Sequence, residues 1–119
     1  MAEPEKREKD QKPRNKEKWL LAAGFKKSWQ KFKTDALCEA MATFDRCKRA
    51  IPPEPLPAKM KDHNLKGPLK GFSECHLDDD ALLIYKPAPK GAIKLFRVCT
   101  HDDLDGPKAK VLAKVLKSE

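Results

Sequence analysis

The chain has 119 residues, enough for one compact domain and too few for two of ordinary size. Hydrophobic residues make up 39% and charged residues 37%, so a small core is possible. The formal net charge of +8 favours a polyanionic partner such as nucleic acid, although a small basic protein need not bind one. No run approaches the roughly 18 apolar residues of a membrane-spanning helix, and no apolar secretion signal opens the chain. We therefore expect a cytoplasmic protein with no membrane partner.

The first 18 residues predict a charged, disordered tail. Basic and acidic side chains alternate there, with two prolines and no apolar residue after Ala2, so nothing offsets the entropy of ordering. Such a tail fits a purely solvating role, and contact with a nucleic acid or a partner is the alternative. Residues 19–119 are expected to form a single domain.

A short strand at 18–22 and an amphipathic helix are predicted next. Phe25, Trp29 and Phe32 recur at the spacing of one helix face. Lysines occupy the opposite side of this helix, where they suit either phosphate groups or plain solvent. The apolar face of this helix is therefore expected to pack in the core, and its lysine face is expected to contact either phosphate groups or solvent.

A second helix should begin at the cap formed by Thr34 and Asp35 and run to about Ala50. The short junction predicts that the two helices form an antiparallel pair, whose apolar stripes both need a sheet to cover them. Residues 51–60 contain four prolines, which exclude a helix or a central strand. We expect an extended connector that delivers His63 to a fairly fixed place.

Three strands follow, at 71–76, 81–86 and 92–98. The middle one, ALLIYK, is apolar almost throughout, which predicts cover on both faces. Short reversals join the three into an antiparallel meander. With the strand at 18–22 they predict an α+β fold, in which a small antiparallel sheet of about four strands carries the two helices on one face. Pro107 opens a C-terminal helix, which could pack on the sheet or remain available for a partner.

All three histidines lie where a loop meets a predicted strand. His63 opens a glycine-containing loop, His76 ends a strand at the LDDD turn, and His101 follows the last strand. A lone histidine is usually structural, but imidazole can serve as acid or base near neutral pH. Because strand ends of a meander can meet, the three predict a shared site. Phe72 and Glu74 share the strand parity of His76.

Acidic and basic side chains accompany these histidines. Asp80 precedes the middle strand and could orient a histidine, although aspartates in the 78–80 turn are favoured for local reasons alone. Cations that suit a phosphate, or a surface ion pair, are Lys61, Lys66, Lys70 and Arg97. Metal-independent RNA cleavage needs this set of groups. A base takes the 2′-hydroxyl proton, an acid protonates the leaving 5′-oxygen, and cations stabilise the phosphorane.

The four cysteines, at 38, 47, 75 and 99, lack the close pairs typical of structural zinc sites. Adjacent Cys75 and His76 should point to opposite faces of a strand, which excludes a cysteine–histidine nucleophile there. No phosphate-binding glycine loop of the P-loop type is present. We therefore expect neither a metal nor a cofactor.

Residues 61–86, together with LFRVCTH at 95–101, resemble the YafQ branch of the RelE/ParE superfamily of bacterial toxins. The shared patterns are a K-D-H-x-L-x-G-x-x-K-G-[YF] loop, a [DE]-x-H-x-x-x-D-x-x-L-I-Y hairpin and a T-H after the last strand. The resemblance implies a RelE-like fold and a ribosome-dependent mRNA endonuclease. It also implies mRNA in the ribosomal A site, ribosomal RNA and a cognate antitoxin as partners.

The resemblance further implies site residues. His63 would be the general base and His101 the general acid, His76 and Asp80 would orient the substrate, and Arg97 would stabilise the phosphorane. Three departures stand out. Asp105 replaces an aromatic residue of YafQ-like chains. The charged N-terminal tail and the helix after Gly106 have no counterpart in their short form. A non-catalytic binding protein on the same scaffold is the alternative function.

Overall fold

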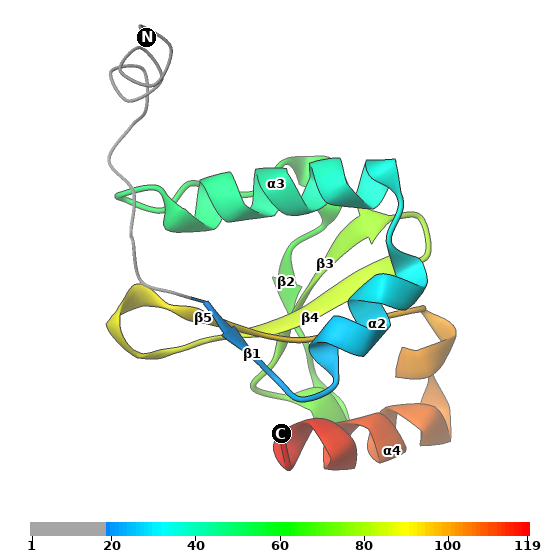
Figure 1. Cartoon of the computed structure of the whole chain (residues 1–119). Helices are drawn as coiled ribbons and strands as arrows, with labels where there is room; N and C mark the ends of the chain where they lie inside the picture. The colour runs from blue at the N-terminus through cyan, green and yellow to red at the C-terminus, as the bar shows by residue number, and fades with distance from the viewer. Residues whose placement is uncertain (1–18) are drawn as a thin grey trace, which may run out of the picture.

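The computed structural model describes residues 19–119 and shows helices on both faces of one sheet (Figure 1). The tail predicted over residues 1–18 lies outside the described residues. The predicted α+β class is confirmed. Within the described part of the chain, no helix combines the length and apolarity needed to cross a membrane.

The sheet has five strands in the order β1-β5-β4-β3-β2. Their bounds are Leu20–Leu21 for β1, His63–Asn64 for β2, Ser73–Asp78 for β3, Ala81–Pro87 for β4 and Ile93–Cys99 for β5. Strands β3, β4 and β5 form the predicted antiparallel meander. The meander therefore brings the C-terminal ends of β3 and β5 to the same end of the sheet, on either side of β4.

Two details of the predicted sheet are wrong. There are five strands rather than about four, because β2 pairs with β3, with His63 opposite Glu74. Two residues are too few to show a strand alternation, so β2 exists only through its partner. The sheet is also not wholly antiparallel, since β1 runs parallel to β5. Both helices and strands β2, β3 and β4 lie between these two strands in the chain, so no tight hairpin constrains their direction.

The two N-terminal helices, α2 (Phe25–Phe32) and α3 (Asp35–Arg49), cover one face of the sheet. The Thr34 hydroxyl accepts a hydrogen bond from the Leu37 N–H at 3.1 Å, which is the predicted N-cap. The helices do not form the expected antiparallel pair. Instead α2 packs mainly on β5 and α3 on β3, because each apolar stripe faces its own part of the sheet.

The C-terminal helix, α4 (Gly106–Lys117), packs on the opposite face of the sheet (Figure 1). Leu112 and Leu116 join Leu82 and Ile84 of β4 in a second apolar cluster. The alternate residues of β4, including Leu83, belong to the first cluster under α2 and α3. The expectation that the central strand is covered on both faces is thus confirmed.

The proline-rich connector is largely extended, apart from a single 3-10 turn at Ala58–Met60. Leu56 and Met60 are buried in the cluster under α3, so the connector is fastened to the core. Lys61 then takes a left-handed backbone conformation with φ of 47°. This turn directs the chain from the connector into β2.

Candidate active site

Glu74 of β3 lies between two histidines. Its carboxylate oxygen Oε1 is 3.5 Å from Nε2 of His63 on β2 and 3.4 Å from Nε2 of His76 on β3. The cross-strand register explains both contacts, because His63 stands opposite Glu74 and His76 follows two residues later on the same face. Glu74 is only 4% exposed, and a buried carboxylate requires partners. Nε2 of each ring faces the carboxylate, which forms an ion pair with either imidazole when that ring is protonated.

The third histidine completes the cluster from the end of β5. The rings of His76 and His101 pack edge to face, with centroids 5.1 Å apart and planes at 76°. Asp80, in the turn before β4, accepts two hydrogen bonds from His101, one from the backbone N–H at 2.8 Å and one at 2.7 Å from Nδ1. The structure therefore brings the three histidines and Asp80 together, as predicted from the sequence.

The hydrogen bonds define which nitrogen of each exposed imidazole is available. His63 Nδ1 lies 2.6 Å from the Lys61 carbonyl oxygen, which only accepts, so Nδ1 carries the proton and Nε2 keeps a lone pair in the neutral ring. The backbone and side-chain hydrogen bonds from His101 hold the pKa of the Asp80 carboxyl below its usual value. Asp80 is therefore an ionised acceptor for Nδ1–H of His101, which leaves Nε2 of that ring for proton transfer.

Asp62 ties the His63 segment to the core. Its carboxylate accepts a short hydrogen bond from the Tyr85 hydroxyl and lies 3.0 Å from the Lys48 ammonium group of α3. Burial, followed by the hydrogen bond to Asp62, raises the pKa of Tyr85 well above its usual value, so the hydroxyl remains a donor. Tyr85 is thus buried in the core with its hydroxyl hydrogen-bonded. The connector and this contact together hold His63 beside Glu74.

The cysteines take no part in the cluster. Burial raises the pKa of the Cys75 thiol far above its usual value and that of Cys99 to about 12, so neither forms a thiolate nucleophile near neutral pH. Cys75 belongs to the core cluster under α3, on the opposite face from His76, as expected. In the described part of the chain, no three His, Cys, Asp or Glu side chains are arranged to hold a metal ion.

Arg97 does not join the histidines, which corrects the predicted site. Its guanidinium forms an ion pair with the Glu119 carboxylate, with Nη2 and Oε2 2.8 Å apart, and it faces the space between α2 and α4. Gly24 leaves room for this arginine, because a Cβ atom at that position would strike the guanidinium. The sequence indicated that Arg97 lies near the end of a strand, but it could not indicate that the ion-pair partner is Glu119, at the C-terminus.

A hollow of about 670 Å³ lies beside His76 and His101, under the N-terminal half of α3. Of the three predicted phosphate-binding lysines, only Lys61 lines this hollow. Lys70 lines a different hollow, and Lys66 lines neither. Sequence reasoning missed two cations here, Lys59 and Arg46, of which Arg46 also lies 3.8 Å from Glu54.

Glu74 is the other functional candidate that sequence reasoning did not single out. The only signal was its parity with His76, because an isolated acidic residue in a strand usually marks a solvent-exposed position. Its burial depends on the two histidines that flank it, one of which comes from another strand.

The RNA cleavage predicted from the sequence gives a test of Asp80. Replacing Asp80 with alanine is expected to slow that reaction roughly tenfold, because His101 loses the charge-assisted hydrogen bond that orients its ring. Asp79→Ala is the matched control in the same turn. The Asp79 side chain borders the hollow but, among residues 19–119, forms no hydrogen bond or ion pair with a histidine, so the rate should stay within about twofold. Single-turnover cleavage rates measure both. Equal rates for the two variants would show that Asp80 is only a turn residue.

Comparison with known proteins places this chain in a family. The family model described as "Bacterial toxin of type II toxin-antitoxin system, YafQ" matches residues 17–106. The curated mRNA interferase toxin YafQ of Escherichia coli strain K12 is 44% identical over 52 residues, which are 44% of this chain and 55% of that protein. The match thus spans about half the length of this curated relative.

Solved structures are similar over a longer part of the chain. YafQ from E. coli strain BL21(DE3) is 30% identical, with a TM-score of 0.57, over 76% of this chain and 100% of that one. The DinJ–YafQ complex of E. coli matches with a TM-score of 0.58 and 30% identity over the same shares. A copper-bound mutant toxin from Helicobacter pylori is 31% identical, with a TM-score of 0.57, over 74% of this chain and 98% of that one.

Proposed function

Because this chain belongs to the YafQ family of toxins of type II toxin–antitoxin systems, we propose that it is a ribosome-dependent mRNA endonuclease. The observation that carries the proposal is the continuous cluster from His63 through Glu74 and His76 to His101 and Asp80. The E. coli relatives named mRNA interferase toxin support the reaction class.

The proposed reaction is attack of a 2′-hydroxyl on the adjacent phosphate. His63 Nε2 takes the hydroxyl proton, since Nδ1 is committed to the Lys61 carbonyl oxygen. His101 Nε2 gives a proton to the leaving 5′-oxygen, while Asp80 holds the ring through Nδ1. The products are a 2′,3′-cyclic phosphate and a free 5′-hydroxyl. Glu74 and His76 keep the two reacting rings in place.

The extra negative charge of the phosphorane needs a cation. Lys61 and Arg46 line the hollow that contains His76 and His101, so we assign charge stabilisation to them. Arg97 would first have to leave Glu119. While this ion pair is formed, Arg97 takes no part in the proposed reaction.

The proposed partners follow from the same family. E. coli YafQ has been solved in complex with DinJ, and we propose that a cognate antitoxin binds this chain. Ribosomal RNA and the mRNA in the A site are the proposed nucleic-acid partners, in keeping with the net charge of +8. This substrate would place the activity in the cytoplasm.

Inducing the protein in bacteria and mapping mRNA 5′ ends tests the function. The wild-type chain should arrest growth and generate new 5′-hydroxyl ends within translated codons, and a His63→Ala, His101→Ala double variant should do neither. Arrest that persisted unchanged in the double variant would instead support the non-catalytic binding protein. Purified chain with mRNA, with and without ribosomes, separates ribosome-dependent cleavage from cleavage of free RNA.

A further inference from the structure

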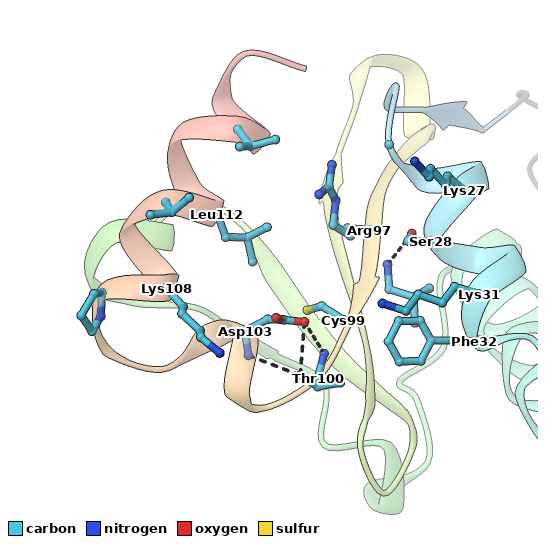
Figure 2. Close-up of a pocket in the computed structure, with 15 residues that line it drawn as sticks. Lys27, Ser28, Lys31, Phe32, Arg97, Cys99, Thr100, Asp103, Lys108 and Leu112 are labelled. Carbon is cyan, nitrogen blue, oxygen red and sulfur yellow. Dashed lines mark hydrogen bonds between the residues drawn. The ribbon is translucent and has the colours of Figure 1, made fainter.

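A groove of about 1130 Å³ lies between α2 and α4, and β5 forms its floor (Figure 2). Lys27 and Lys31 border it from α2, and Leu112 faces it from α4 (Figure 2). None of the three histidines lines it. The groove is therefore a second feature of the molecule, separate from the candidate active site.

One wall of the groove is an addition to the family pattern. The family match ends at residue 106, where α4 begins. This helix has two apolar faces: Leu116 and Ala113 are buried against the sheet, whereas Val111 and Val115 line the groove and are 65% and 38% exposed. Packing on the sheet requires only one apolar face. The second face is thus available to a partner.

The opposite wall supplies positive charge. Lys27 and Lys31 lie one helical turn apart on α2 and are exposed. The Lys31 ammonium lies 5.8 Å from the centroid of the Phe32 ring, and neither lysine forms an ion pair with a carboxylate of residues 19–119. The other cations of the groove already have carboxylate partners, Asp102 for Lys108 and Glu119 for Arg97. The groove therefore has an apolar wall facing a wall with two uncompensated charges.

We propose that this groove binds an acidic amphipathic helix of the antitoxin, an inference that rests on the proposed function for the identity of the partner. The apolar face of such a helix would cover Val111 and Val115, and its carboxylates would pair with Lys27 and Lys31. Helices commonly dock in this way into a groove between two others. RNA fits less well, because phosphates match the lysines but gain nothing from the valines.

The test uses the full chain and two synthetic peptides in fluorescence anisotropy. Both peptides carry leucine at i, i+3, i+4 and i+7; the first has glutamate on its polar face, and the second has lysine at the same positions. The glutamate peptide should bind and the lysine peptide should not. A Lys27→Glu, Lys31→Glu double variant should weaken binding about tenfold. The matched control, Lys26→Glu with Lys33→Glu, carries the same change of net charge on exposed residues that do not line the groove, and should bind within twofold of wild type.

Three results would overturn the proposal: similar affinity for both peptides, equal weakening in the two double variants, or displacement of the glutamate peptide by a 12-nucleotide RNA. Cleavage of mRNA on ribosomes keeps the two proposals apart. If the chain cleaves mRNA but does not bind the glutamate peptide, only the groove assignment fails. If it binds the peptide but wild type cleaves nothing, the proposed function fails and the groove still binds an acidic helix.

Discussion

Replacing His101 with alanine is expected to slow mRNA cleavage about 10²–10⁴-fold, the usual contribution of a positioned general acid. The reason is geometric: Asp80 holds Nδ1 of this ring, and its Nε2 is the nitrogen left for proton donation. Single-turnover cleavage rates of the variant and the wild type measure the effect.

Two controls separate lost chemistry from lost structure. The His101 side chain is 56% exposed, so the variant should retain its thermal unfolding midpoint within a few degrees. Added imidazole should restore part of the rate, because the vacated position is open to solvent. A variant that cleaved at the wild-type rate would remove His101 from the role of general acid.

Replacing Phe44 with alanine is expected to lower the free energy of unfolding by about 3–5 kcal/mol. Phe44 is fully buried, and its ring packs edge to face on Trp19 at 5.3 Å and on Tyr85 at 5.0 Å. Small domains are stable by only about 5–15 kcal/mol. The loss would therefore take up a large fraction of the total stability. Urea unfolding should show a lower midpoint with little change in slope.

The matched control is Phe32→Ala, which removes the same ring from a position at the border of the same core cluster. Phe32 is only partly buried, so we expect it to cost less than half as much as Phe44→Ala. Tyr85 loses its aromatic neighbour in the Phe44 variant, so the Asp62 contact that holds His63 should weaken as well. Equal costs for the two variants would show that burial at Phe44 is not what stabilises this core.

Local patterns in the sequence were sufficient for much of the fold. The apolar run of β4 and its short reversals predicted the meander, because alternation and turn chemistry act over only a few residues. The Thr34 cap and the stripe of α2 were predicted for the same reason. The spacing of the K-D-H loop and the hairpin was specific enough to indicate the family, which comparison confirmed.

The features that sequence analysis did not reach depend on how separate elements are placed relative to one another. Strand β2 is visible only through its register with β3, and that register also buries Glu74 beside His63. The ion pair between Arg97 and Glu119 joins residues that are 22 positions apart in the sequence.

Sequence alone therefore determined the class of fold and the family, and it predicted that the three histidines and Asp80 share a site. Tertiary structure decided that Glu74 links two of those histidines, that Arg97 stands apart from them, and that α4 leaves a groove beside α2. The physical reason is that periodicity reports which face of an element is apolar, whereas a contact also requires the relative placement of two elements. Only the folded chain specifies that placement.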